Sequence, residues 1–249
     1  MTAPEMRNLF NVLYNNIMSN QAPGLNEYEI SVFLTKAEFE VLKNYFNPKG
    51  NKYQEGMDDS RKRQIDFSNI IKVQDSITPV SPSKRIDPRS VCFDLPSDVM
   101  FILNEWSSSV VTNGVISSDM SDYITVVPIT ADEYQRLMSK PYKYPPLGQA
   151  WRLIANGTYQ RTSSYVGDYV ELISSDTILS YSVRYVKMPS PIITSDLGTS
   201  VSIYNEHNRH DCELDPILHE EIVQRAVELA KAAYVGDVNA TIQMGQRSE

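Results

Sequence analysis

The sequence predicts an α+β protein, in which N-terminal helices and the C-terminal helix form a bundle and a central antiparallel β-rich domain contains a short inserted helix. Apolar residues recur at three- and four-residue spacings near both ends of the chain, and this period changes to two from Val91 onward. We expect a helical bundle (1–75), an extended linker (76–90), the β-rich domain (91–212), a C-terminal helix packing on the bundle (213–236) and a C-terminal arm (237–249).

The N-terminal part contains two helix-start signals. Thr2 with Glu5, and Asn26 with Glu29, have the spacing of a capping box, in which two side chains satisfy backbone N–H groups at the start of a helix. Each pair precedes an apolar stripe with helical spacing. A third, weaker helix is expected over residues 60–73, after two aspartates.

The middle of the chain has the signals of a linker followed by strands. Three prolines among residues 76–90 predict an extended segment without a periodic apolar face. Thr130 with Glu133 predicts a short capped helix between strands. Asn156-Gly157 is a hairpin signal, and residues 169–173 and 178–186 predict a hairpin around residues 174–176.

The C-terminal helix has the clearest pattern in the chain. Asp215 is its expected N-cap, Pro216 its first residue and Gly236 its stop. Its two apolar stripes span more of the circumference than one surface stripe requires, which predicts two packing partners. These stripes are Leu218, Ile222, Ala226, Leu229 and Ala233, and Val223, Val227, Ala230 and Tyr234.

The overall charge argues against several classes of partner. The chain has 31 acidic and 23 basic residues and a net charge of −8, so as a whole it repels phosphate backbones and anionic membranes. Without an N-terminal signal segment or a long apolar run, we expect a soluble protein that is not exported by a signal peptide and has no membrane partner. Cys92 and Cys212 do not suggest a disulfide framework.

The sequence contains no pattern that requires catalysis. Glycine-rich phosphate loops are absent, and the start of a zinc-protease helix at His219-Glu220 fails because Val223 stands where the second histidine is needed. We therefore expect no catalytic residue and no cofactor. A weak metal candidate is His207, His210 and Cys212, whose imidazole and thiolate groups are zinc ligands; a polar loop is the simpler interpretation.

Two short basic stretches leave a nucleic-acid role open. They are residues 61–63 and 84–85, and the first of them lies near several aspartates. A solvated helix face explains such runs more simply. The alternatives to a structural protein are therefore a nucleic-acid-binding accessory protein and a zinc-dependent enzyme.

Four stretches of the chain resemble a known family: residues 9–16, 21–37, 138–145 and 214–231. They resemble the head-to-tail adaptor, or neck ring, proteins of crAss-like tailed phages. The last stretch is more distantly similar to podovirus tail tubular and head-completion proteins.

The resemblance implies a structural virion protein, not an enzyme. It implies a homo-oligomeric ring of about twelve copies that binds the portal protein, contacts further tail or neck ring proteins and continues the DNA channel. Packaged DNA would pass without sequence-specific binding through a lumen that, at roughly −96 in total, repels it. Such a ring belongs to the neck or tail of the virion and is assembled in the host cytoplasm.

Two sets of site residues follow from this interpretation. The stripe of Val223, Val227, Ala230 and Tyr234 is expected to face the neighbouring subunit, while the other stripe faces the chain's own bundle. The arm after the helix is expected to become ordered against the portal through its scattered apolar residues, Val238, Ile242 and Met244.

Overall fold

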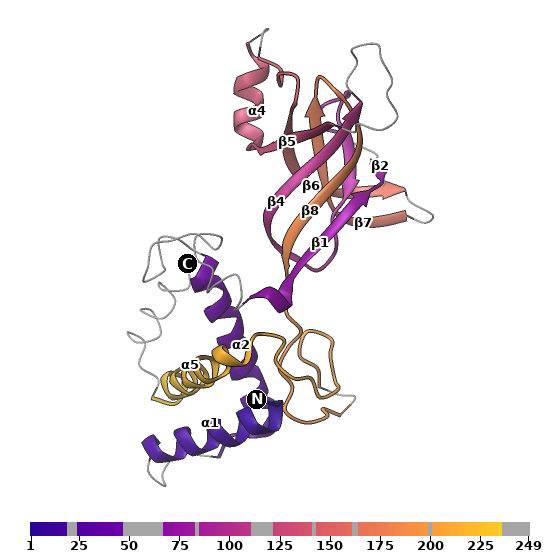
Figure 1. Ribbon diagram of the computed structural model, residues 1–249. Coiled ribbons are helices and arrows are strands. Elements are labelled where there is room, and N and C mark those ends of the chain that lie inside the picture. Colours follow the sequence, from indigo (N-terminus) through magenta and orange to yellow (C-terminus); the bar gives the residue numbers. More distant parts are fainter. Residues whose placement is uncertain are drawn as a thin grey trace. The chain divides into compact units, whose positions relative to one another are not determined.

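The computed structural model describes residues 1–18, 24–46, 67–82, 85–110, 122–140, 143–160, 164–198 and 201–235. Helices lie at both ends of the chain and a sheet lies between them in sequence, which confirms the α+β class (Figure 1). The chain divides into two compact units. We call residues 1–70 with 189–249 the helical unit, and residues 71–188 the sheet unit.

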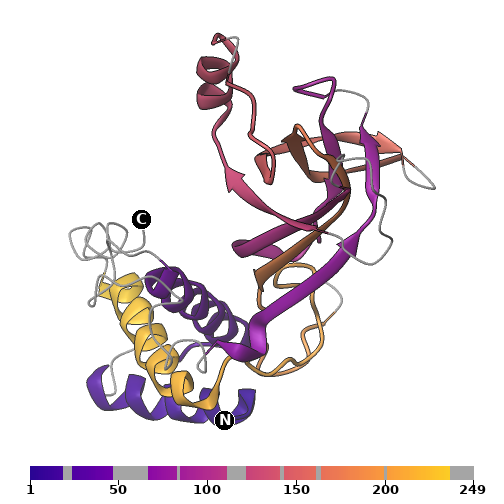
Figure 2. The same ribbon diagram turned by 45° about the horizontal axis from the view of Figure 1, so that its top comes forward.

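The helical unit is built from α1 (Ala3–Met18), α2 (Glu27–Phe46) and α5 (Pro216–Val235). Two views show α5 between α1 and α2, and it contacts both of them (Figures 1 and 2). The segment from 189 to 215 also belongs to this unit, although its residues 189–212 were expected in the β-rich domain. Its fully buried core residues include Met6, Phe10, Ile30, Leu34, Leu42, Ile222 and Val223.

The predicted capping residues are found at the helix starts. Asn26 Oδ1 accepts from Glu29 N and Glu29 Oε2 accepts from Asn26 N, both at 2.8 Å, so this capping box is reciprocal. Thr2 N donates to Glu5 Oε2 at 2.8 Å in the same way. These local hydrogen bonds explain why the starts of α1 and α2 can be read from the sequence.

The sheet unit contains an eight-stranded sheet and α4 (Ala131–Met138). The strand order is β1-β8-β4-β5-β6-β2-β3-β7, and β7 also pairs with β6. The strands are β1 (Ile71–Ile77), β2 (Pro79–Pro82), β3 (Val91–Asp94), β4 (Val99–Val110), β5 (Asp122–Pro128), β6 (Gln149–Gln160), β7 (Ser164–Ser174) and β8 (Thr177–Lys187).

The sheet is mixed, where the sequence predicted an antiparallel one. β5 and β6 run parallel, with Thr125 opposite Gln149, and the other pairs are antiparallel. A parallel pair needs a crossover connection, and the predicted inserted helix, α4, lies in that crossover. Thr130 and Glu133 form its predicted capping box.

Residues 71–90 differ from the expected helix end and linker. Within the described part of the predicted third helix, only residues 68–70 form a helical turn, and β1 begins at Ile71. β1 is a strand because it pairs with β8, which local sequence does not reveal. Residues 79–82 form β2, which pairs with β3 and β6 instead of remaining an unpaired linker.

The loop after β2 is fixed by two buried carboxylates. Glu171 on β7 is fully buried, and its oxygens accept from Ile86 N at 3.0 Å and Ser90 Oγ at 3.1 Å. Asp87 Oδ1 accepts from Arg89 N at 2.8 Å, and Asp87 Oδ2 accepts from Tyr134 OH at 3.1 Å. This proline-containing loop is therefore part of the sheet unit's structure.

Two predicted hairpins are wrong. Ser174 and Thr177 are the adjacent ends of β7 and β8, yet β7 pairs with β3 and β6, whereas β8 pairs with β1 and β4. Asn156-Gly157 lies within the β6–β7 ladder, opposite Asp168 and Gly167. At residues 174–176 long-range strand pairing overrides the local turn signal, whereas Asn156-Gly157 is paired inside the ladder of the consecutive strands β6 and β7.

Candidate functional site

The start of α5 is determined by its first residues. Asp215 Oδ1 accepts from Ile217 N at 3.0 Å, and Pro216 occupies the first helical position, where a missing N–H has no cost. The predicted stop at Gly236 lies outside the described residues, and α5 is described to Val235. The sequence therefore predicts where this helix begins.

Both predicted apolar faces of α5 are buried within a single chain. In the first stripe, Leu218, Ile222, Ala226 and Leu229 are buried, while Ala233 is exposed. In the second stripe, Val223, Val227 and Ala230 are 0%, 2% and 3% exposed, and the side chain of Tyr234 lies outside the described part.

The two packing partners of α5 are present in its own chain. α1 and α2 both contact α5, as Figure 2 shows. A contact between Val223, Val227 or Ala230 and a neighbouring subunit would therefore require these helices to separate. The role of this stripe and Tyr234 in a subunit interface remains a prediction.

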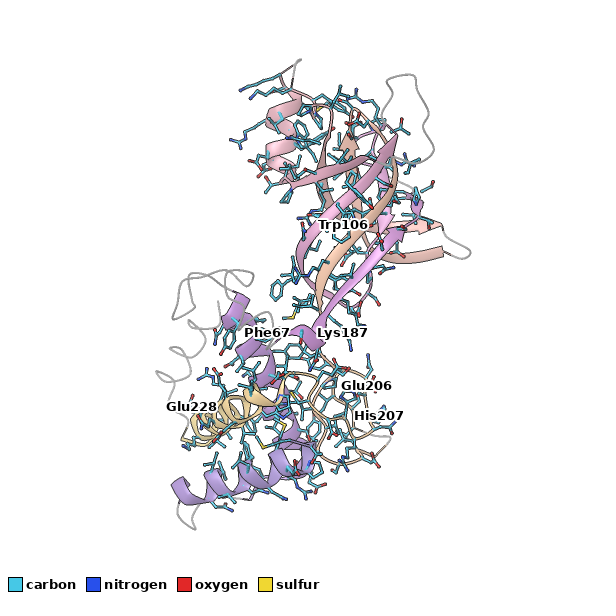
Figure 3. The ribbon with its side chains drawn as sticks, viewed as in Figure 1. Phe67, Trp106, Lys187, Glu206, His207 and Glu228 are labelled. Atoms are coloured by element: carbon cyan, nitrogen blue, oxygen red, sulfur yellow. The ribbon has the colours of Figure 1, made fainter. Side chains whose placement is uncertain are left out.

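The outer face of α5 is polar and mostly acidic. Its exposed residues are Ile217, Glu220, Glu221, Gln224 and Glu228, and Figure 3 labels Glu228 on this helix. Two ion pairs hold Arg225 beside this face. Arg225 Nη2 lies 2.7 Å from Glu40 Oε2, and Arg225 Nη1 lies 2.9 Å from Glu228 Oε2. We call the five exposed residues the α5 outer face.

A polar stripe on α2 binds the segment that follows the sheet unit. Ser31, Thr35 and Glu38 lie at helical spacing and are buried. Ser31 Oγ accepts from Thr194 N, and Thr35 Oγ1 accepts from the N–H of Ile192, both at 3.1 Å. This stripe was not predicted from the sequence, although small polar residues recur at helical spacing beside the apolar stripe of α2.

Among the carboxyl groups that the structure describes in this unit, Glu38 has the largest pKa shift. The pKa of Glu38 is raised to about 8. Burial is the largest cause, and the nearby carboxylate of Glu213 also raises the pKa, whereas the hydrogen bond from Cys212 lowers it. Cys212 Sγ donates to Glu38 Oε1 at 3.3 Å, whereas Glu38 Oε2 is buried without a hydrogen-bond partner. Glu38 is therefore mainly protonated at neutral pH.

The three weak metal candidates bind different partners. His207 Nδ1 lies 2.8 Å from Val201 O, His210 Nε2 lies 3.9 Å from Glu213 Oε1, and Cys212 binds Glu38. Figure 3 labels His207 in the loop after residue 189. Within the described ranges, no three His, Cys, Asp or Glu side chains are grouped so that they could hold a metal ion.

The remaining predicted features are only partly visible. The arm residues Val238, Ile242 and Met244 lie outside the described residues, as do the basic stretch 61–63 and Lys84. Arg85 donates to Ser90 O at 3.0 Å and so helps to fix the loop after β2. In the described part of the chain, no helix is long and apolar enough to cross a membrane.

Comparison with known proteins assigns the chain to a class. The family model described as phage tail ring protein 3/4 matches residues 1–242. The chain therefore belongs to this family of bacteriophage ring proteins. It is a structural ring protein of the phage neck or tail, which confirms the resemblance found in the sequence.

Two relatives come from Bacteroides phage crAss001. "Ring protein 4/5" is 51% identical over 255 residues, which cover all of both chains. "Ring protein 3" is 28% identical over 230 residues, which cover 92% of this chain and 95% of the relative. Because both matches extend through the helical and sheet units, the similarity concerns the whole architecture and not one motif.

Proposed function

We propose that this chain forms a homo-oligomeric ring that joins the portal to the tail and continues the DNA channel. The observation that carries the proposal is the 51% identity, over the full length of both chains, to a relative named "Ring protein 4/5". Identity at this level, over the full length of both chains, supports the same mode of assembly. We propose about twelve copies in a closed cyclic ring.

The charge of the chain supports a channel through which DNA slides. A net charge of −8 per copy gives an assembled ring a strongly negative total. The helical unit carries most of this charge, because it has 19 acidic and 12 basic residues. The sheet unit has 12 acidic and 11 basic residues. We propose that packaged DNA passes through the lumen without sequence-specific binding.

The proposed partners are the portal protein and other rings of the neck or tail. crAss001 has two relatives of this chain, "Ring protein 4/5" and "Ring protein 3", which supports contacts between related rings in one virion. We propose that the arm with Val238, Ile242 and Met244 binds the portal, and that the ring is assembled in the host cytoplasm before it enters the virion.

Cryo-electron microscopy of virions tests this function directly. The proposal predicts density for a closed ring of this chain between the portal and the tail, with acidic side chains lining the bore. A location outside the neck and tail, or a strongly basic bore, would contradict it. Deleting residues 237–249 should weaken attachment to the portal, and unchanged attachment would exclude the proposed role of the arm.

A further inference from the structure

The turn that precedes β6 presents an apolar side chain to solvent. Leu147 is 75% exposed, and Gln149 N donates to Pro146 O at 3.2 Å, which closes a β-turn over residues 146–149. Gly148 has φ +81°, the left-handed conformation that the third position of a type II turn requires. Leu147 therefore occupies the outward second position of this turn.

The turn is held in place by the residues between β7 and β8. Gly148 N donates to Asp176 Oδ2 at 2.7 Å, and Asp176 is only 8% exposed. Ser175 Oγ donates to Pro145 O at 2.7 Å, and Ser174 Oγ donates to Gln149 O at 2.8 Å. Because these hydrogen bonds fix the turn before any partner binds, Leu147 loses little conformational entropy when a partner covers it.

A second exposed apolar residue lies at the same end of the parallel pair. This residue is Tyr123, which is 73% exposed. Thr125 of β5 lies opposite Gln149 of β6. Tyr123 and Leu147 each lie two residues before one of these partners. Val127, further along this face of β5, packs with α4 instead. An exposed aromatic side chain such as Tyr123 is typical of interface anchors.

Exposed basic side chains lie on α4 and in the segment between α4 and Leu147, while α4 also exposes Asp132 and Glu133. Arg136 on α4, and Lys140 and Lys143 after it, are exposed. Arg136 has a long ion pair of 4.0 Å with Glu133, whereas neither lysine has an ion-pair partner among the described residues. We call Tyr123, Arg136, Lys140, Lys143 and Leu147 the α4 face.

We propose that the α4 face of one copy binds the α5 outer face of a second copy of this chain. A closed ring needs two different surfaces that complement each other. Here a surface with Lys140, Lys143 and exposed apolar side chains complements an acidic one that exposes Ile217. The inference rests on the proposed ring function, and it uses surfaces that a neighbour can reach without separating the helices of the bundle.

Loss of the anchor tests this contact. Leu147→Ser should raise the protein concentration at which half of the chains assemble by about tenfold or more, with an unchanged melting temperature. Leu179→Ser removes another half-exposed leucine, on β8, and should assemble as the wild type does. Light scattering and negative-stain microscopy of the purified full chain measure both. Normal assembly of Leu147→Ser would overturn the inference while leaving the ring function intact.

Charge exchange identifies the partner surface. Lys140→Glu with Lys143→Glu should weaken assembly, and adding Glu220→Lys with Glu221→Lys in the same chain should restore it, because each junction regains opposite charges. Weakening without restoration would exclude the α5 outer face as the partner. If the wild-type chain forms no ring under any of these conditions, both the contact and the proposed ring function fail.

Discussion

Cys212 donates its thiol hydrogen to Glu38 at 3.3 Å, which joins the segment before α5 to the polar side of α2. The two residues are far apart in sequence, and burial raises the pKa of both groups, so the contact is one between neutral side chains. It holds a protonated glutamic acid in the helical unit, whose stability should therefore depend on pH.

The first prediction concerns this pH dependence. Because the pKa of Glu38 is raised from 4.5 to about 8, its contribution to stability is complete below about pH 4.5 and is lost as pH rises through about 8. The wild-type free energy of unfolding should fall over this range, by up to about 5 kcal/mol. Glu38→Gln should remove that part of the fall.

Denaturant unfolding between about pH 5 and about pH 9 measures the effect. Glu206→Gln is a matched control, since Glu206 is exposed and should leave the pH profile as in the wild type. Parallel pH profiles for Glu38→Gln and the wild type would show that Glu38 is not held protonated by the fold.

The second prediction distinguishes packing from assembly at α5. Val227 is 2% exposed, so Val227→Asp places an unpaired carboxylate among α5 and its partners and should unfold the helical unit. The exposed Gln224→Asp is its control and should change stability little. Circular dichroism melting measures both. A folded Val227→Asp monomer that cannot assemble would instead place Val227 in the subunit interface.

The third prediction concerns the loop after β2. Glu171→Ala leaves the N–H of Ile86 and the hydroxyl of Ser90 without their buried acceptor, and should cost about 2–3 kcal/mol. Limited proteolysis should then cut within residues 85–90, where the wild type resists. Asp132→Ala, at an exposed position of α4, should change neither result. An equally protected loop in Glu171→Ala would show that Glu171 does not fix it.

The predictable parts of this fold are those determined by neighbouring residues. The capping boxes at Asn26 and Thr130 and the N-cap at Asp215 each depend on residues within one helical turn, so the sequence contains them completely. The period-two pattern likewise predicts the strand β8. These features require no knowledge of the rest of the fold.

The unpredicted parts depend on contacts between distant residues. β1 is a strand because of its partner β8, and the mixed sheet arises because α4 makes a crossover between β5 and β6. The pattern of α5 predicted two covered faces but could not distinguish helices of the same chain from a neighbour. A buried glutamic acid such as Glu38 gives no sequence signal, because most glutamates are exposed.

The fourth prediction concerns DNA. An acidic ring through which DNA slides should bind duplex DNA weakly, and its affinity should lack the steep decrease with salt that follows from release of phosphate counterions. Fluorescence anisotropy with a labelled duplex at several salt concentrations measures this. Tight binding with a steep salt slope would contradict passage without binding and would favour a nucleic-acid-binding role.

The central claim is that this chain is a subunit of a closed ring in the phage neck or tail. Cryo-electron microscopy of virions, at a resolution that identifies side chains, tests it most directly. We expect a ring of about twelve copies between portal and tail, with the α4 face of each copy on the α5 outer face of the next. Finding the chain as single copies, or outside the neck and tail, would contradict the account.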